Sequence, residues 1–157
     1  MKNRSYNKYR RNIGSISSGT MRPEDLIPTF LWELCQQRPL KREHGKLATV
    51  IQHCINRDPA YYYDSEDAVQ DLLALFNALD FYSLPYFYFG AHPGDGADYG
   101  WWLPEDWEDQ FDGLQVGDLA AEVPKGYTGE VLHVNDHGDM TLYRASRGRL
   151  TELWGIV

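Results

Sequence analysis

Three side chains that could do chemistry gather in one short turn, where His92, Asp95 and Asp98 are separated by proline, alanine and glycine. An imidazole beside two carboxylates could serve acid–base catalysis, and Asp oxygens in a glycine turn could bind Ca²⁺ or Mg²⁺. The segment lacks the further carboxylates and the closing Glu of a complete Ca²⁺ loop. We therefore predict that these residues shape a β-hairpin, with a ligand or metal site as the alternative.

A second cluster of imidazoles and carboxylates follows later in the chain: His133, Asp136, His137 and Asp139. Such groups could bind zinc or transfer protons, but here they bracket a predicted turn instead of sharing one helix face. Asn135-Asp136 followed by Gly138 is typical of a hairpin turn, which is the interpretation that we favour.

Other signatures of catalysis or cofactor binding are absent from the sequence. It contains no Gly-x-Ser-x-Gly, no Walker A motif and no Rossmann fingerprint. Cys35 and Cys54 fall on apolar helical stretches without CxxC spacing, so we expect both to be reduced core residues. The sequence therefore predicts no cofactor, no metal and no enzymatic activity.

The segment after the glycine turn combines aromatic rings with carboxylates and contains no cation. Its members are Trp101, Trp102, Glu105, Asp106, Trp107, Glu108, Asp109, Phe111 and Asp112. Rings anchor protein interfaces, and carboxylates steer basic partners toward them. The segment predicts a surface for a basic protein, including one whose basic site normally holds nucleic-acid phosphates. The alternative is a solvated acidic face over tryptophans that are buried in the core.

Charge is distributed unevenly along the 157 residues, whose net charge is −8. Residues 1–57 carry eleven basic and four acidic side chains, whereas residues 58–124 carry fifteen acidic side chains and no Lys or Arg. The central block cannot neutralise itself by local ion pairs, and its charge disfavours nucleic-acid binding. We expect water, cations, the basic N-terminal block or another molecule to balance it.

The elements that must position these groups divide into a helical part, 21–84, and a β part, 85–157. Apolar residues at helical spacing predict helices around Leu26–Leu34, Leu47–Ile55 and Val69–Leu79, and Pro28 is expected to break or kink the first. Residues 1–20 are basic and then rich in Ser and Gly, which is typical of a flexible tail.

Short aromatic runs at 86–91 and 97–103 flank the glycine turn and predict a β-hairpin. Three or four further strands are predicted among the runs 119–123, 127–134, 140–145 and 150–157. The predicted fold class is α+β, with three N-terminal helices packed on a C-terminal antiparallel sheet made of the hairpin and a small meander or half-barrel. Residues 21–157 would form a single domain.

The strings Tyr86–Trp102 and Gly126–Gly138 resemble segments of small proteins of bacteria and of their phages and plasmids, and the likeness covers residues 86–157. The resemblance implies an accessory protein and brings no established activity, so no catalytic residue is carried over. Together with the acidic aromatic segment, it suggests a non-enzymatic counter-defence inhibitor, similar to an anti-CRISPR protein, that occupies a basic site on a host protein.

Two alternatives stay open. One is a metal-dependent hydrolase or ligand-binding enzyme centred on His92, Asp95 and Asp98. The other is a structural protein that buries its excess rings, eleven Tyr, six Phe and five Trp, in a homodimer interface. The first twenty residues lack the apolar run of a signal peptide, and no stretch holds the roughly 18 to 20 apolar residues that span a bilayer. We therefore expect a cytoplasmic protein that does not enter membranes.

Overall fold

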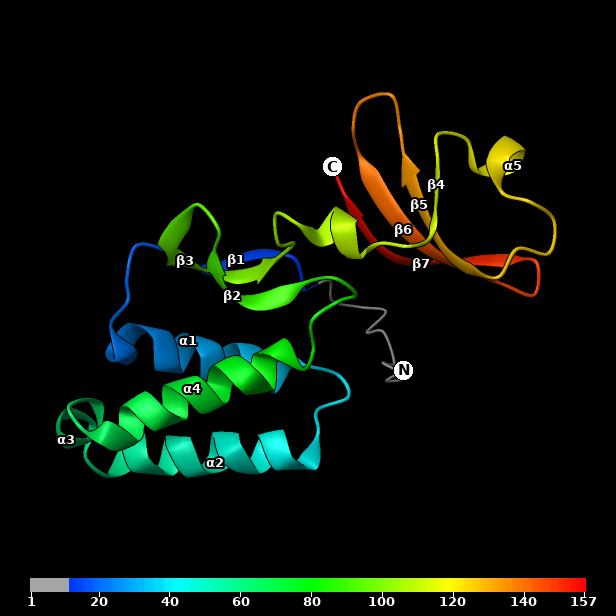
Figure 1. The fold of residues 1–157 in the computed structure, drawn as a ribbon. Helices are drawn as coiled ribbons and strands as arrows, with labels where there is room; N and C mark the ends of the chain where they lie inside the picture. Colours follow the sequence, from blue (N-terminus) through cyan, green and yellow to red (C-terminus); the bar gives the residue numbers. More distant parts are fainter. Residues whose placement is uncertain (1–11) are drawn as a thin grey trace. The chain divides into compact units, whose positions relative to one another are not determined.

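The computed structural model describes residues 12–157, and the chain divides into two compact units. The N-terminal unit ends at Pro104, and the C-terminal unit is Glu105–Val157 (Figure 1). The α+β class predicted from the sequence is confirmed, but each unit has a sheet of its own. The division therefore falls within the predicted β part, 85–157.

The N-terminal unit places four helices between its first strand and its terminal hairpin. The elements are β1 (Gly14–Ser17), α1 (Pro23–Gln36), α2 (Arg42–Arg57), α3 (Pro59–Tyr63), α4 (Glu66–Asp80), β2 (Tyr88–His92) and β3 (Asp95–Trp102). Pro23 occupies the first turn of α1, and the helix continues through Pro28 without the expected break. Ser65 caps α4 by accepting a hydrogen bond from the Ala68 backbone nitrogen.

The three-stranded sheet of this unit has the order β1-β3-β2, with both pairs antiparallel. Residues 14–17 were predicted to belong to a flexible tail and instead form its edge strand; residues 1–11 of that segment lie outside the described residues. Gly100 of β3 faces Ser15 so closely that an added Cβ would lie against the carbonyl group of Gly14. A glycine is therefore required at this position.

The helices form two layers on the sheet (Figure 1). Helices α1 and α4 contact each other, and they contact β1 and β2 respectively. Helix α2 lies on the side of α1 and α4 that faces away from the sheet. Phe30 of α1 is fully buried between the layers, where its ring makes edge contacts with Phe76, Phe89 and Tyr99 at centroid distances of 5.1, 5.1 and 5.9 Å.

The C-terminal unit is a four-stranded sheet with two short helices. Its elements are η1 (Trp107–Gln110), β4 (Leu114–Val116), α5 (Leu119–Glu122), β5 (Gly129–Val134), β6 (Met140–Ser146) and β7 (Arg149–Ile156). The sheet order is β4-β5-β6-β7, and β4 is parallel to β5, so the sheet is not wholly antiparallel. Trp154 is fully buried in this unit and packs against Trp107 at a centroid distance of 5.7 Å.

One strand expectation is wrong in this unit. Residues 119–123 were predicted as a strand, but Leu119–Glu122 form α5. The carboxylate of Asp118 accepts hydrogen bonds from the backbone nitrogens of Ala120 and Ala121, and this cap stabilises a helical turn. No helix within residues 12–157 combines the length and the apolar character that crossing a bilayer requires.

Candidate functional site

The predicted ligand turn is a hairpin whose polar groups bind their own backbone. The ring nitrogen Nδ1 of His92 accepts a hydrogen bond from the Gly94 backbone nitrogen at 2.9 Å, and Asp95 accepts one from Ala97 at 3.0 Å. Asp98 accepts a hydrogen bond from the Ser15 hydroxyl, which ties the turn to β1. The three side chains thus have structural partners that account for their residue types.

The second cluster also belongs to a turn, between β5 and β6. The side-chain oxygen of Asn135 accepts hydrogen bonds from the backbone nitrogens of His137 and Asp139, both at 2.9 Å. His133 instead lies near the Gly117 carbonyl, at 3.2 Å from its Nε2 atom. Across residues 12–157, no three His, Cys, Asp or Glu side chains lie close enough together to hold a metal ion.

The acidic aromatic segment is divided between the two units. Trp101 is 1% exposed in the N-terminal unit, and Trp107 is 6% exposed in the C-terminal unit, so neither indole is accessible to a partner. Trp102 is half-buried and donates from Nε1 to the Gly90 carbonyl at 3.1 Å. The carboxylates are exposed: Glu105, Asp106, Glu108, Asp109 and Asp112.

A different surface combines exposed apolar side chains with a cavity, and it lies in the N-terminal unit. A groove of ≈ 830 Å³ runs between α1 and α2. Helix α1 contributes four residues at helical spacing, Pro28, Leu31, Trp32 and Cys35. Helix α2 contributes a second stripe, and Leu40 and Tyr63 also line the groove. The α2 stripe is Gly45, Ala48, Thr49, Gln52, His53, Ile55 and Asn56.

Trp32 is the most informative residue of this groove. It is 61% exposed, whereas Trp101 and Trp154 are buried, so Trp32 is not held in the core. Of the eight large apolar side chains that the described residues expose, five lie on α1 to α4: Trp32, Val50, Tyr61, Val69 and Leu73. Of these five, only Trp32 also lines the groove, so it is the exposed apolar anchor of this surface.

The apolar stripe of α2 is only partly covered by the rest of the unit. Leu47, Val50, Ile51, Cys54 and Ile55 form an apolar stripe, yet only Ile51 of these five is buried, together with Ala48. An amphipathic helix normally gains its stability by burying such a stripe against the core. Of this stripe only Ile55 also lines the groove, where it is half-buried.

The cysteines lie on this helical layer. Cys35 lines the groove and is exposed, which corrects the prediction of a core residue, and Cys54 is half-buried. Its position at i+3 from Trp32 carries Cys35 to the solvent side of α1. Cys35 and His53 both line the groove, but no hydrogen bond joins them among the contacts of the described residues. A thiol–imidazole pair for nucleophilic catalysis is therefore not formed.

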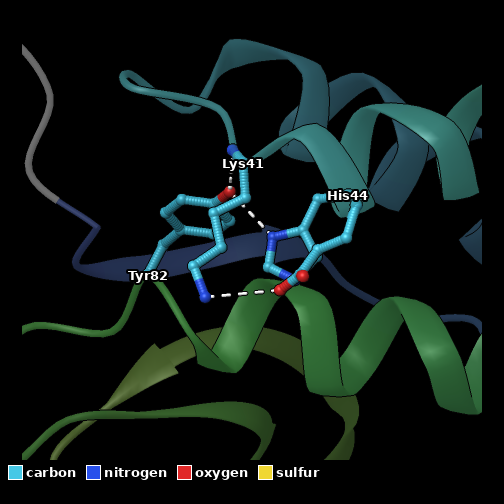
Figure 2. Close-up of polar contacts among 4 residues, drawn as sticks. Lys41, His44 and Tyr82 are labelled. Atoms are coloured by element: carbon cyan, nitrogen blue, oxygen red, sulfur yellow. Dashed lines mark hydrogen bonds and ion pairs between the residues drawn. The ribbon is translucent and has the colours of Figure 1, made fainter.

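A polar contact with Tyr82 holds the first turn of α2 in place (Figure 2). The Tyr82 hydroxyl accepts a hydrogen bond from the Lys41 backbone nitrogen at 3.0 Å and lies 2.8 Å from Nδ1 of His44. Because this hydroxyl accepts from Lys41, its own proton is available to His44, whose Nδ1 then acts as the acceptor. The ammonium group of Lys41 reaches Glu43 at 3.3 Å and lies 3.6 Å from the centre of the Phe81 ring.

Burial favours the neutral forms of these side chains. It lowers the pKa of His44, an effect that Glu43 opposes and Lys41 reinforces. Burial also raises the pKa of Tyr82. The neutral phenol and the neutral imidazole therefore stabilise the N-terminus of α2 together, next to Gly45 and Leu40 of the groove.

The other end of the groove is fixed by α3. Tyr62 donates a hydrogen bond to Asp71 of α4 at 2.8 Å, and burial raises the pKa of Tyr62. Tyr63 lines the groove, and burial together with the charge of Glu24 raises its pKa. Both phenols stay protonated at neutral pH, so neither adds charge to this end of the groove, and the nearby Glu24 pairs with Arg22.

The outer edge of the groove carries positive charge. At 100° per residue, Arg42, Lys46 and Arg57 fall within a sector about 60° wide on α2 that also contains His53. His53 and its neighbour Thr49 line the groove, so the three cations form its rim. Within residues 12–157 no carboxylate forms an ion pair with any of them, and none of the described lining residues is acidic.

Sequence reasoning missed this groove because it used the apolar stripes only to locate helices. Two signals were present: Trp32 falls on the face of α1 opposite the stripe Leu26, Phe30, Leu34, and the cations of α2 recur on one face. Neither signal shows how fully α2 is covered. That property depends on how the helices pack.

The chain matches no protein-family model, and comparisons with curated proteins and with solved structures find no match either. No residue role can therefore be transferred from a relative.

Proposed function

We propose that this protein is a non-enzymatic interaction protein that binds its partner through the groove between α1 and α2. The observation that carries the proposal is Trp32, which stands 61% exposed on the wall of a ≈ 830 Å³ groove that is mostly apolar. Exposed tryptophan is rare on surfaces that serve no contact, and tryptophan is enriched at the energetic centres of interfaces.

The construction of α2 supports the same proposal. Gly45, Ala48 and Thr49 have small side chains, so an incoming backbone can approach this wall closely. Ile55 belongs to the apolar stripe of α2, lines the groove and is only half-buried. Burial of such side chains contributes about 25 cal/mol per Å² of apolar surface, which is the main favourable term in protein association.

Site-specific photo-crosslinking tests this proposal. A benzophenone maleimide attached to Cys35 would capture whatever enters the groove, in a Cys54→Ser background that leaves one thiol. The matched control carries the same probe on a Ser146→Cys variant that lacks both native cysteines, because Ser146 is exposed on the C-terminal unit. We expect one or a few proteins from the source cells to crosslink through Cys35 alone. Identical products from both probes, or none, would contradict the proposal.

The exposed carboxylates of the C-terminal unit are a second candidate surface. Two of these carboxylates, Glu105 and Asp106, precede η1, and two, Glu108 and Asp109, lie within it. No described cation pairs with any of them. Such a surface fits a basic partner, as the counter-defence inhibitor suggested by the sequence would need. A variant with all four carboxylates changed to amides would lose salt-sensitive retention of that partner, while Trp32→Ala would keep it. If the two variants retained the basic partner equally, the carboxylates around η1 would not be its binding surface.

A further inference from the structure

We propose that the groove between α1 and α2 receives an acidic amphipathic helix of a partner protein. This inference rests on the function proposed above and names the chemistry of the partner. Its apolar side chains would lie against Pro28 and Trp32 of α1, which are both exposed, and its carboxylates would face Arg42, Lys46 and Arg57 at the rim.

The shape of the groove favours a helix. Helices α1 and α2 are joined by a short connection and run antiparallel (Figure 1). The lining residues of the two helices form the two walls of the groove. Each wall repeats at three and four residues, and side chains at that spacing interdigitate with the ridges of a third helix. The α2 wall extends from Gly45 to Asn56, about 16 Å at 1.5 Å per residue, which matches roughly three turns of a docked helix.

The charge at the rim selects an acidic helix. Three cations line one edge, the described lining residues include no acidic group, and Arg38 adds a fourth cation near Leu40. Arg38 donates to the carbonyls of Cys35 and Gln37, so its charge stays at the end of α1 beside the groove. Carboxylates that flank an apolar stripe would meet all of these cations.

A second copy of the chain fits this face poorly. Antiparallel two-fold pairing of α2 with α2 of another copy would set Arg42 against Arg57 and Lys46 against His53, and the like charges of the arginines oppose such an interface. Nucleic acid also fits poorly, because the chain carries a net charge of −8 and the groove is lined mainly by apolar residues. Both occupants are outcomes that the following experiment can detect.

The experiment is a selection of helical peptides against the full chain. The display library consists of helices of about 16 residues with Leu, Phe or Met on one face. Each flanking position is free to be Glu, Gln or Lys. We expect Glu to exceed Lys about tenfold at the flanks of the selected peptides, since several rim ion pairs add small increments. The overall negative charge of the chain works against this preference, so a Glu preference must arise locally.

Three variants locate the preference. Arg42→Glu with Lys46→Glu should reverse it toward Lys, whereas Lys125→Glu with Arg149→Glu makes the same charge change in the C-terminal unit and should leave it unaltered. Thr49→Tyr fills the groove from an exposed position and should abolish binding of every selected peptide. Far-UV circular dichroism and thermal unfolding must show that all variants fold like the parent chain.

The outcomes separate this inference from the proposed function. If the selected peptides bind the parent chain, fail to bind Thr49→Tyr and show no preference for Glu, the partner is not an acidic helix. The proposal that the groove is the binding site would still hold. Peptides that survive Thr49→Tyr, or a selection that yields none, would overturn the groove as well. Displacement of the peptide by a fluorescent DNA duplex would identify nucleic acid as the occupant instead of an acidic helix. A dimer in sedimentation that Thr49→Tyr dissociates would identify a second copy of the chain.

Discussion

The hydroxyl of Tyr82 lies 2.8 Å from Nδ1 of His44, although the two residues are 38 positions apart in the chain. Tyr82 follows the end of α4, and His44 lies in the first turn of α2. The same hydroxyl accepts a hydrogen bond from the backbone nitrogen of Lys41, the residue before α2. No side-chain cap is present at this end of the helix. One phenol thus caps α2 and positions the helix that forms a wall of the groove.

Removing the hydroxyl should destabilise this arrangement. Tyr82→Phe leaves the Lys41 N–H and His44 Nδ1 without their shared partner, so we expect a loss of about 1–2 kcal/mol in the free energy of unfolding. The pKa of His44 should rise in the variant, because a donor to the neutral ring is gone. Urea unfolding and an NMR titration of His44 measure the two effects. Tyr61→Phe, at an exposed phenol, is the control and should change neither.

Stability should depend on pH through His44. Its pKa in the folded chain is below 6.5, the value in the unfolded chain, so the unfolded state binds more protons between these two values. The contribution is fully present above pH 6.5 and is lost as the pH falls through the folded pKa. The free energy of unfolding should therefore fall more steeply below pH 6.5 in the parent chain than in His44→Gln. Parallel curves for the two proteins would contradict this assignment.

The glycines of β3 should differ sharply in their tolerance of a methyl group. A Cβ on Gly100 would lie 2.9 Å from the Ser15 Cα and closer still to Gly14, so Gly100→Ala must separate β1 from β3. We expect a loss of at least about 3 kcal/mol. Gly96→Ala on the same strand meets no atom within 4 Å and serves as the matched control. Equal stability of the two variants, measured by chemical unfolding, would contradict the described pairing of β1.

Two tryptophans of the N-terminal unit should behave in opposite ways. Trp101 is buried against Phe89 at a centroid distance of 4.8 Å, so Trp101→Ala should cost about 3–5 kcal/mol. Trp32 is exposed, so Trp32→Ala should change stability by only about 0.5 kcal/mol while it abolishes capture through the groove. Thermal unfolding compares the two. A large destabilisation by Trp32→Ala would place Trp32 in the core instead of at a binding surface.

The sequence predicted the main helices well because their apolar stripes are long and periodic. The stripe Val69 to Leu79 and the cap Ser65 together define α4. Strand β1 was missed because Gly14–Ser17 is short and polar, and its pairing partner lies more than 80 residues away. The apolar run at 119–123 predicts a strand, but the carboxylate of Asp118 caps a helical turn there, and the run alone does not reveal that cap.

The candidate site was predicted less well than the fold, for a physical reason. Composition located the tryptophans near the carboxylates at 105–112, but burial is decided by tertiary packing, which encloses Trp101 and Trp107 and leaves Trp32 exposed. A stripe such as Leu47 to Ile55 indicates only that a helix has an apolar side. Whether the chain itself covers that side cannot be read from the stripe.

The most direct test of the account is an NMR titration of the full chain, labelled with ¹⁵N, with a helical peptide that carries Leu on one face and Glu on its flanks. We predict that the indole resonance of Trp32 and the amide resonances of residues 45–56 shift together and saturate at one peptide concentration. The indole resonance of Trp154, buried in the C-terminal unit, should stay in place. Shifts confined to residues 105–112, or an unmoved Trp32, would contradict the claim that this protein binds through the groove between α1 and α2.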